Sequence, residues 1–293
     1  MTNHVNTILV TGGAGRLGAN LAYGLREKGN SVRVMDIPAA DFSPFEGEEG
    51  FEVIKGDIRD SNVVKESVDG CSMVFHLAAI LPPASENNRE LTMSVNIEGT
   101  GTLADACRRA GPIPLMFSSS VSTYGDTTAE EPPVGVEHPQ RALNIYPESK
   151  IKAERLLKEA GIPYAILRIA GIAVPAFLDP PDPWPFVPTQ RVEFIALNDL
   201  VTALLNLVGN AGAYGRAFNL SGGGSWQVLG EEYARRYCET LQISFESQKF
   251  YEQPGWLDWY DTAESQAALN YQNTSFDEFH AMLKSAMEAA LGE

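Results

Sequence analysis

Cysteine and histidine are scarce in this sequence of 293 residues, and neither is spaced as a metal site requires. The three cysteines (Cys71, Cys107 and Cys238) form no CxxC pair, and the four histidines show no ligand spacing. We therefore expect no metal, no disulfide framework and a reducing compartment, the cytoplasm. The N-terminal residues lack a basic segment followed by an apolar core, and no apolar run reaches membrane length, which agrees with that expectation.

Positive charge is scarce as well. The chain has 22 lysines and arginines against 38 aspartates and glutamates, a formal net charge of −16. Nucleic acids and anionic membranes are bound through clustered lysines and arginines, so neither is expected as a partner. A small ligand that carries phosphate is still compatible with this charge, because backbone N–H groups at a helix N-terminus can hold it.

Short apolar runs alternate with helical patterns over roughly the first 170 residues. Strands are predicted at 6–13, 31–36, 51–57, 71–79, 113–120 and 163–170, and helices at 16–30, 88–110 and 146–161. Strands that alternate with helices predict an α/β fold with a doubly wound parallel sheet covered on both faces.

The regular alternation ends near residue 171. Residues 173–190 are dense in proline and predict neither a long helix nor a central strand. Further on, helices are predicted at 198–210 and 225–241, a strand and turn at 216–224, and two helices within 260–292. We therefore expect a Rossmann-type domain over 1–171 and a small, mixed substrate-binding lobe over 172–293, with some of its segments returning to the sheet.

The stretch "TGGAGRLG" at 11–18 opens a helix directly after the first strand. Gly12 permits a tight turn, Gly15 lets a pyrophosphate approach the backbone, and Gly18 lets the helix pack against the strand. Asp36 ends the second strand, where a carboxylate can accept a hydrogen bond from the adenosine ribose of NAD and repel the 2′-phosphate of NADP. Arg16 weakens that preference, because a guanidinium there could reach a phosphate.

Several other segments accompany the glycine turn: "GDIRD" at 56–60, "HLAA" at 76–79, "VNIEGT" at 95–100, "SSSVSTYG" at 118–125, "YPESK" at 146–150 and "ILRIAG" at 166–171. In this combination the chain resembles the extended short-chain dehydrogenase/reductases, in particular the NAD-dependent sugar epimerase/dehydratase family. The resemblance spans nearly the whole chain and is strongest in the first 170 residues. It implies a Rossmann fold, bound NAD, a small-molecule substrate and a homodimer.

Tyr146 and Lys150 are four residues apart, so they lie on one face of the predicted helix. An ammonium near a phenol favours the phenolate, and we expect Lys150 to lower the pKa of Tyr146 towards the working pH. Tyr146 would then take the proton of the substrate hydroxyl. The resemblance implies that Ser120 binds the reacting oxygen and completes the catalytic set.

The resemblance also implies the residues that contact NAD, with Asp57 and Ile58 at the adenine and Lys150 at the nicotinamide ribose. For Asn96, a structural role is an alternative with almost equal support. The complete expected set is Gly12, Gly15, Arg16, Leu17, Gly18, Asp36, Asp57, Ile58, Leu77, Ala78, Ala79, Asn96, Ser118, Tyr146 and Lys150.

Substrate contacts are expected from Ser120, Tyr146 and Arg191. The proline-rich segment is placed after the strand that ends near the nicotinamide, and we expect it to cover the substrate. Its aromatic residues, Phe177 and Trp184 among them, either stack on a sugar or base or pack the lobe.

The resemblance covers enzymes with different reactions. Dehydration is rejected here because Ser120 is followed by Val121 and Ser122, where dehydratases carry an acid pair. A 4-epimerase acting on a sugar nucleotide is the favoured interpretation. A dehydrogenase or reductase of a smaller hydroxy substrate is the alternative, because Gly171 replaces the usual asparagine and Arg191 is the only cation of the following segment. A non-catalytic NAD-binding protein is the third hypothesis.

Overall fold

The computed structural model describes residues 6–292, so His4, one of the four histidines considered above, lies outside it. The chain forms two compact units. The first contains the residues up to Ser120 together with Asn144–Leu167 and Leu204–Ala217, and the second contains Val121–Leu143, Arg168–Ala203 and the residues from Phe218 onward. The expected boundary near residue 171 lies close to one of these division points, but 121–143 belongs with the C-terminal residues and 204–217 with the N-terminal ones.

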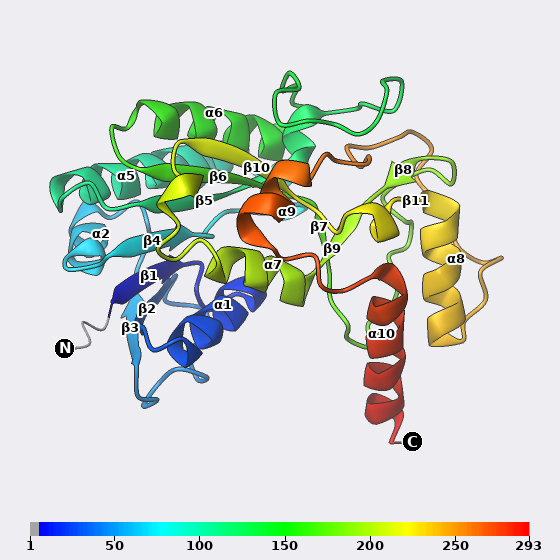
Figure 1. Ribbon diagram of the computed structural model, residues 1–293, viewed down its shortest axis with the longest axis horizontal. Helices are drawn as coiled ribbons and strands as arrows, with labels where there is room; N and C mark the ends of the chain where they lie inside the picture. The colour runs from blue at the N-terminus through cyan, green and yellow to red at the C-terminus, as the bar shows by residue number, and fades with distance from the viewer. Residues whose placement is uncertain (1–5, 293) are drawn as a thin grey trace. The chain divides into compact units, whose positions relative to one another are not determined.

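Strands and helices alternate from the start of the described chain (Figure 1). The strands are β1 (Thr7–Thr11), β2 (Ser31–Asp36), β3 (Phe51–Lys55), β4 (Met73–His76), β5 (Leu115–Ser120), β6 (Tyr164–Ile169), β7 (Gly171–Ala173), β8 (Arg191–Val192), β9 (Phe194–Ala196), β10 (Arg216–Leu220) and β11 (Val228–Leu229). The α-helices are α1 (Arg16–Glu27), α2 (Ser61–Val68), α3 (Ala84–Asn87), α4 (Arg89–Met93), α5 (Gly99–Arg109), α6 (Ile145–Glu159), α7 (Leu197–Leu205), α8 (Gly230–Leu241), α9 (Ala263–Leu269) and α10 (Phe276–Leu291). Over residues 6–292, no helix combines the length and apolar character that crossing a bilayer requires.

The central sheet has seven strands in the order β10-β6-β5-β4-β1-β2-β3. The pairs β1–β2, β1–β4, β2–β3 and β4–β5 are parallel, and the order reverses direction at β1. Such a reversal leaves a crevice at the carboxyl ends of the strands, which is where ligands bind in doubly wound folds. The predicted Rossmann-type α/β fold is confirmed.

Helices cover both faces of the sheet in the first unit. In Figure 1, α2, α5 and α6 lie on one face and α1 on the other. On the first of these faces, Leu9 and Val74 of the strands pack with Leu103 of α5 and Leu157 of α6 in one buried cluster. Burying side chains of this size stabilises the fold by about 1.5–3 kcal/mol each.

The helix predicted over 88–110 is present but is not a regular α-helix. A π-helical turn (Ser94–Glu98) separates α4 from α5 and contains the buried Asn96. Such turns insert one extra residue into a helix and are frequent at functional sites.

The second unit is built around two small sheets and a core rich in aromatic side chains. β7 pairs with β9 in parallel and β8 with β11 in antiparallel orientation. Trp184 and Phe186 of the proline-rich segment are buried in this core, whereas Phe177 is 45% exposed. Of the two roles considered for these aromatic residues, packing is the one that Trp184 and Phe186 have.

A buried polar network lies where β1 and β4 end. His76 has no exposed surface, and its ring nitrogens contact Thr11 Oγ1 at 2.8 Å and Thr100 Oγ1 at 2.9 Å. Thr100 Oγ1 donates to the Asn96 carbonyl at 2.7 Å, so it accepts from His76 Nε2–H and the Thr11 hydroxyl donates to Nδ1. Burial and the nearby Lys150 charge lower the pKa of His76 to about 3. His76 is therefore a neutral structural residue.

This network predicts a loss of stability in acid. An unfolded histidine takes up a proton below its ordinary pKa of about 6.5, whereas folded His76 does so only below about 3. Between these values the unfolded state binds more protons. The free energy of unfolding therefore decreases as the pH is lowered, by up to about 1.4 kcal/mol per pH unit. Urea unfolding of the unmodified protein and of His76→Gln, measured from pH 6 to pH 4.5, gives the free energy of unfolding at each pH. Plotted against pH, this free energy should have a slope that is shallower in His76→Gln by about that amount. Equal slopes in the two proteins would contradict the buried neutral state.

Candidate active site

The glycine turn connects β1 to α1. Gly12 has a φ of +69°, and a Cβ there would lie 2.7 Å from the backbone nitrogen of Ala78. A Cβ on Gly18 would lie 2.2 Å from the Gly12 carbonyl oxygen. Glycine is thus required at both positions by close approach of the backbone. Gly15 is the N-cap of α1, and no side chain caps the N–H groups of the first turn. This turn starts with the exposed Arg16 and the partly buried Leu17.

Asp36 lies beside this turn, as the sequence predicted. Its Oδ2 accepts a hydrogen bond from the Ala14 N–H at 3.1 Å, and Oδ1 accepts from the Ile37 N–H at 2.8 Å. The carboxylate is partly exposed, and the Ile37 side chain after it is 54% exposed. A negative charge and an apolar residue therefore occupy the end of β2, which suits a ribose hydroxyl better than a 2′-phosphate.

The residues after β4 lie close to the turn. The Leu77 N–H donates to the Thr11 carbonyl at 3.0 Å, and the Ala78 N–H to Thr11 Oγ1 at 3.4 Å. These bonds place the partly exposed Leu77 and Ala78 next to Gly12, and the partly exposed Ala79 follows them along the chain.

At the end of β3, Ile58 is buried in the core and Asp57 is partly exposed. The Arg59 guanidinium binds the Asp57 carboxylate, with Nη2 2.6 Å from Oδ2, and lowers the pKa of Asp57. This ion pair fixes the carboxylate that the sequence analysis assigned to the adenine.

These residues fit a dinucleotide. Uncapped N–H groups at the start of a helix and its dipole suit a pyrophosphate, the close-packed glycines let it approach, and Asp36 suits the ribose. In the described part of the chain, no group of three or more histidines, cysteines or carboxylates could hold a metal ion.

β5 and α6 supply Ser118, Ser120, Tyr146 and Lys150, all within the first unit. Lys150 is 2% exposed, and its Nζ donates to the Ser118 carbonyl at 2.7 Å. The Nζ lies 5.7 Å from the centre of the Tyr146 ring. Ser118 Oγ donates to the His76 carbonyl at 3.0 Å, and Ser120 is buried at the end of β5. The structure thus brings Ser118, Tyr146 and Lys150 together, and Ser120 stands at the end of β5, two residues beyond Ser118.

Burial affects the two titratable groups in opposite senses. It lowers the pKa of Lys150 to about 7, against the opposing effect of the Glu154 carboxylate. Desolvation of the phenol raises the pKa of Tyr146, although part of this residue reaches the surface. The expected lowering of the Tyr146 pKa is therefore not the direction found, because burial of the phenol favours its neutral form.

Asn96 connects the π-helical turn to α6. Its Oδ1 accepts from the Ile80 N–H at 2.8 Å, and its Nδ2 donates to the Ile80 carbonyl at 3.2 Å and to Ser149 Oγ at 2.9 Å. Both ends of the amide are used within the protein. These contacts support the structural alternative over a direct contact with NAD.

Two carboxylates that were not expected from the sequence accept hydrogen bonds in this region. Glu154 is fully buried one turn beyond Lys150 and accepts a hydrogen bond from Ser119 Oγ at 2.5 Å. Glu86 accepts hydrogen bonds from the backbone N–H groups of Ile145 and Tyr146. The position of Glu154 at the helical spacing after Lys150 was a detectable signal, whereas nothing in the sequence connects Glu86 to α6.

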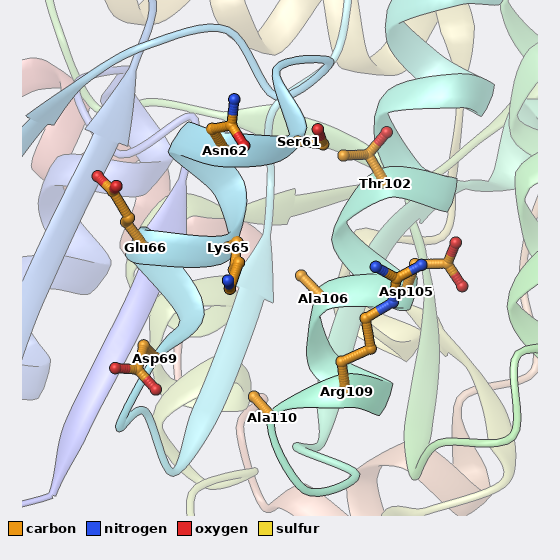
Figure 2. A pocket seen from close by; sticks show the side chains of 10 residues that line it. All are labelled: Ser61, Asn62, Lys65, Glu66, Asp69, Thr102, Asp105, Ala106, Arg109 and Ala110. Atoms are coloured by element: carbon orange, nitrogen blue, oxygen red, sulfur yellow. The ribbon is translucent and has the colours of Figure 1, made fainter.

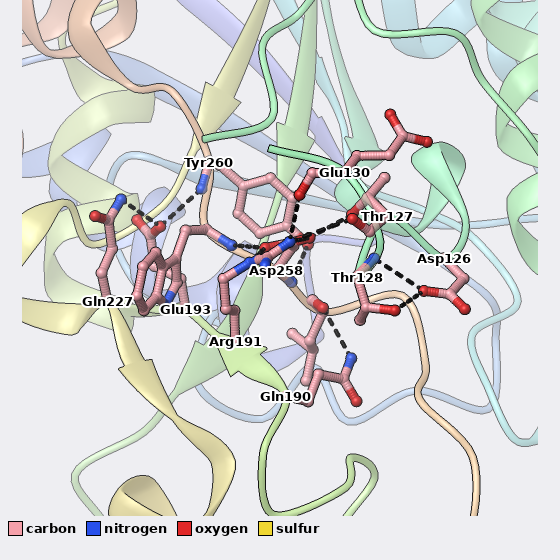
Figure 3. Close-up of polar contacts among 12 residues, drawn as sticks. Asp126, Thr127, Thr128, Glu130, Gln190, Arg191, Glu193, Gln227, Asp258 and Tyr260 are labelled. Carbon is pink, nitrogen blue, oxygen red and sulfur yellow. Dashed lines mark hydrogen bonds and ion pairs between the residues drawn. The ribbon is translucent and has the colours of Figure 1, made fainter. Parts of the chain in front are cut away.

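Arg191 lies in the second unit, and its guanidinium is bound there (Figure 3). Nε and Nη2 contact the fully buried Asp258 at 2.5 and 2.9 Å, and Nη2 also donates to the carbonyls of Thr127 and Glu130. The side chain is 20% exposed. These bonds give Arg191 a structural role that competes with the expected substrate contact.

A hollow of about 650 Å³ lies elsewhere on the first unit, between α2 and α5 (Figure 2). Its lining includes Lys65, Asp105 and Arg109 but none of the expected site residues. It is separate from the site at Tyr146.

Curated proteins of other organisms are similar to about half of this chain. A 3 beta-hydroxysteroid dehydrogenase/Delta 5-->4-isomerase of Mycobacterium tuberculosis is 34% identical over 170 residues, which cover 54% of this chain and 43% of the relative. D-erythronate dehydrogenase of Cupriavidus necator is 32% identical over 162 residues, covering 52% of this chain and 48% of the relative. The chain thus spans less than half the length of these curated relatives.

The fold extends to the whole chain in solved structures. UDP-glucose 4-epimerase of Thermotoga maritima, solved with UDP-glucose, has a TM-score of 0.82 at 19% identity and covers 97% of this chain and 99% of its own. The sequence model of the NAD dependent epimerase/dehydratase family matches residues 8–177, more than half of the chain. As its motifs had indicated, the chain belongs to the NAD-dependent epimerase/dehydratase family.

Proposed function

We propose that this protein is an NAD-dependent dehydrogenase of a secondary alcohol that carries no diphosphate group. The observation that carries this proposal is the state of Arg191. It is the only lysine or arginine between residues 172 and 191, and its guanidinium is bound to Asp258 and to two backbone carbonyls. Arginine and lysine side chains are a common means of binding the diphosphate of a sugar nucleotide.

The other cations of the second unit also have partners within the unit, most of them in exposed ion pairs. The unit has seven lysines and arginines against twenty aspartates and glutamates. Arg141, Arg235, Arg236, Lys249 and Lys284 each pair with a carboxylate of the unit. Arg168 is buried and donates to Tyr124 Oη and the Val136 carbonyl. If this unit supplies the substrate contacts, it favours a substrate without a diphosphate.

The chemistry follows from three side chains of the first unit. Tyr146 Oη takes the proton of the substrate hydroxyl, and Ser120 Oγ donates a hydrogen bond to the same oxygen. The Lys150 ammonium favours the phenolate of Tyr146, against the desolvation that raises the pKa of this phenol. NAD, when bound, accepts the hydride from the carbon that bears the hydroxyl.

The curated relatives support oxidation as the reaction, because both are dehydrogenases by name. Epimerisation of a sugar nucleotide at C4 is the second candidate, since Ser120, Tyr146 and Lys150 would suffice for it. Dehydration is disfavoured because the buried Val121 and Ser122 follow Ser120 and supply no acid. A panel of D-erythronate, a 3β-hydroxysteroid and UDP-glucose, assayed for NADH release, separates these reactions.

Location and assembly are also part of the proposal. The described cysteines Cys71, Cys107 and Cys238 are free and buried, which suits a reducing cytoplasm. A hollow between α5 and α6, lined by Ile97, Leu156 and others, offers a surface for a second copy in a homodimer.

Removing the proton acceptor should abolish most activity. Tyr146→Phe deletes only the phenolic oxygen, so turnover should fall by about 10²-fold or more while folding and NAD binding persist. Turnover is measured as NADH release with the panel alcohol that the unmodified protein oxidises fastest. Tyr251→Phe, at a tyrosine 48% exposed in the second unit, is the matched control and should keep full activity. A near-normal rate for Tyr146→Phe would show that another group takes the proton.

Cofactor preference should depend on Asp36. Asp36→Ala removes the acceptor for the ribose hydroxyl and should weaken NAD binding by about 1–3 kcal/mol, while NADP binding improves because a repulsive charge is lost. Titrations with NAD and NADP measure both changes. Asp41→Ala, five residues further on, should leave both affinities unchanged. If the unmodified protein already prefers NADP, Arg16 governs the site and the assignment to Asp36 fails.

The role of Arg191 can be tested by stability and kinetics together. Arg191→Ala leaves the buried Asp258 carboxylate without its cation and should lower the free energy of unfolding by about 3 kcal/mol in urea. Arg141→Ala removes an exposed ion pair with Glu130 and should cost less than about 1 kcal/mol. If Arg191→Ala leaves the stability unchanged and raises the substrate KM, Arg191 contacts the substrate as first expected. The main support for a substrate without a diphosphate is then lost.

A further inference from the structure

The first turn of α6 lacks a cap from its own sequence. Among the described residues, Asn144 is the N-cap of this helix and its side chain makes no capping hydrogen bond. The first N–H groups of a helix have no partner within the helix. In α6 these belong to Ile145 and Tyr146, because Pro147 has no N–H to donate.

Glu86 supplies the missing acceptors from a distant part of the chain. Its Oε2 accepts from the Ile145 N–H at 2.9 Å, and its Oε1 accepts from the Tyr146 N–H at 3.0 Å. Ser85 Oγ donates to Oε1 at 3.0 Å and helps to hold the carboxylate. One partly buried carboxylate therefore binds both free donors, and its negative charge is favoured at the positive end of the helix.

The contact fixes the backbone of Tyr146 itself. Glu86 lies in α3, which follows the residues after β4 that approach the glycine turn. Asn96 makes a second bond between this region and α6, at Ser149, but it does not touch Tyr146. Ser149 Oγ donates to the Tyr146 carbonyl at 2.7 Å from within α6, whereas the Tyr146 N–H donates to Glu86, which lies outside this helix.

We propose that Glu86 is a positioning residue for Tyr146. By capping the first turn of α6, Glu86 keeps the phenolic oxygen of Tyr146 in its place in the active site. The proposal rests on the proposed function, in which Tyr146 takes the substrate proton. A misplacement of about 1 Å at a reacting group can cost about 10²-fold in rate, so a lost cap should appear in kcat.

The contact can be tested without a substrate. Hydrogen–deuterium exchange of the NAD-saturated protein should show the Ile145 and Tyr146 amides exchanging about tenfold faster in Glu86→Ala. Glu86→Gln keeps the size of the side chain and one acceptor oxygen, and should fall between Glu86→Ala and the unmodified protein. Glu90→Ala, at an exposed glutamate of the neighbouring α4, is the matched control and should not change these amides. Unchanged exchange in both Glu86 variants would overturn the cap.

The effect on Tyr146 is tested with a double-mutant cycle, measured with the panel alcohol that is oxidised fastest. Glu86→Ala should lower kcat by about 10–100-fold with less than about threefold change in KM and in the Kd for NAD. In the Tyr146→Phe background the same change should have almost no further effect on kcat, because Glu86 acts through Tyr146.

An equal loss of kcat in both backgrounds would overturn the positioning role and leave Glu86 as a stabilising residue only. The proposed function is judged separately by Tyr146→Phe alone. If that variant keeps its activity, the proposed function fails and Glu86 cannot position a proton acceptor. The exchange measurement still decides whether Glu86 caps α6.

Discussion

The burial of the Lys150 ammonium is the constraint on which the active-site region depends. A charge that is 2% exposed must be paired or hydrogen-bonded, since an isolated buried ion is strongly disfavoured. The Ser118 carbonyl accepts one of its protons, the Phe117 ring lies 4.8 Å away, and Glu154 supplies the opposite charge. Because these partners lie on β5 and α6, the lysine fixes the helix against the strand. The position of Tyr146 follows from that arrangement.

Several carboxylates of this acidic chain bind backbone N–H groups in turns, loops and at a helix end. Asp36, Glu86, Glu193 and Asp199 each accept hydrogen bonds from two backbone N–H groups, in the glycine turn, at α6, and in the loops near Gly223 and Thr274. A carboxylate that is bound in this way satisfies loop backbone that would otherwise lack partners. The excess of negative charge is thus partly explained by structure and not by recognition of a ligand.

The features of the fold and site that depend on short-range sequence patterns could be predicted from the sequence. The sheet, the glycine turn, Asp36 and the pairing of Tyr146 with Lys150 on one helix face all follow from spacing within a few residues or from the βαβ order. Contacts between distant segments could not be predicted from it. Asp258 follows Arg191 by 67 residues and Glu86 precedes Tyr146 by 60, and no periodicity connects them. The direction of the Tyr146 pKa also depends on burial, which a single sequence does not report.

The π-helical turn at Ser94–Glu98 has a consequence for how this chain tolerates change in its length. A π-helical turn accommodates one extra residue within a helix, so a deletion of one residue here would restore a regular helix and leave the segments on either side in nearly the same orientation. Asn96, which lies within the turn, would then lose its contacts with Ser149 and Ile80, whereas Thr100 beyond the turn would keep its contact with His76. Homologous chains that share this network should therefore align through this helix without gaps, even where the loops on either side differ in length.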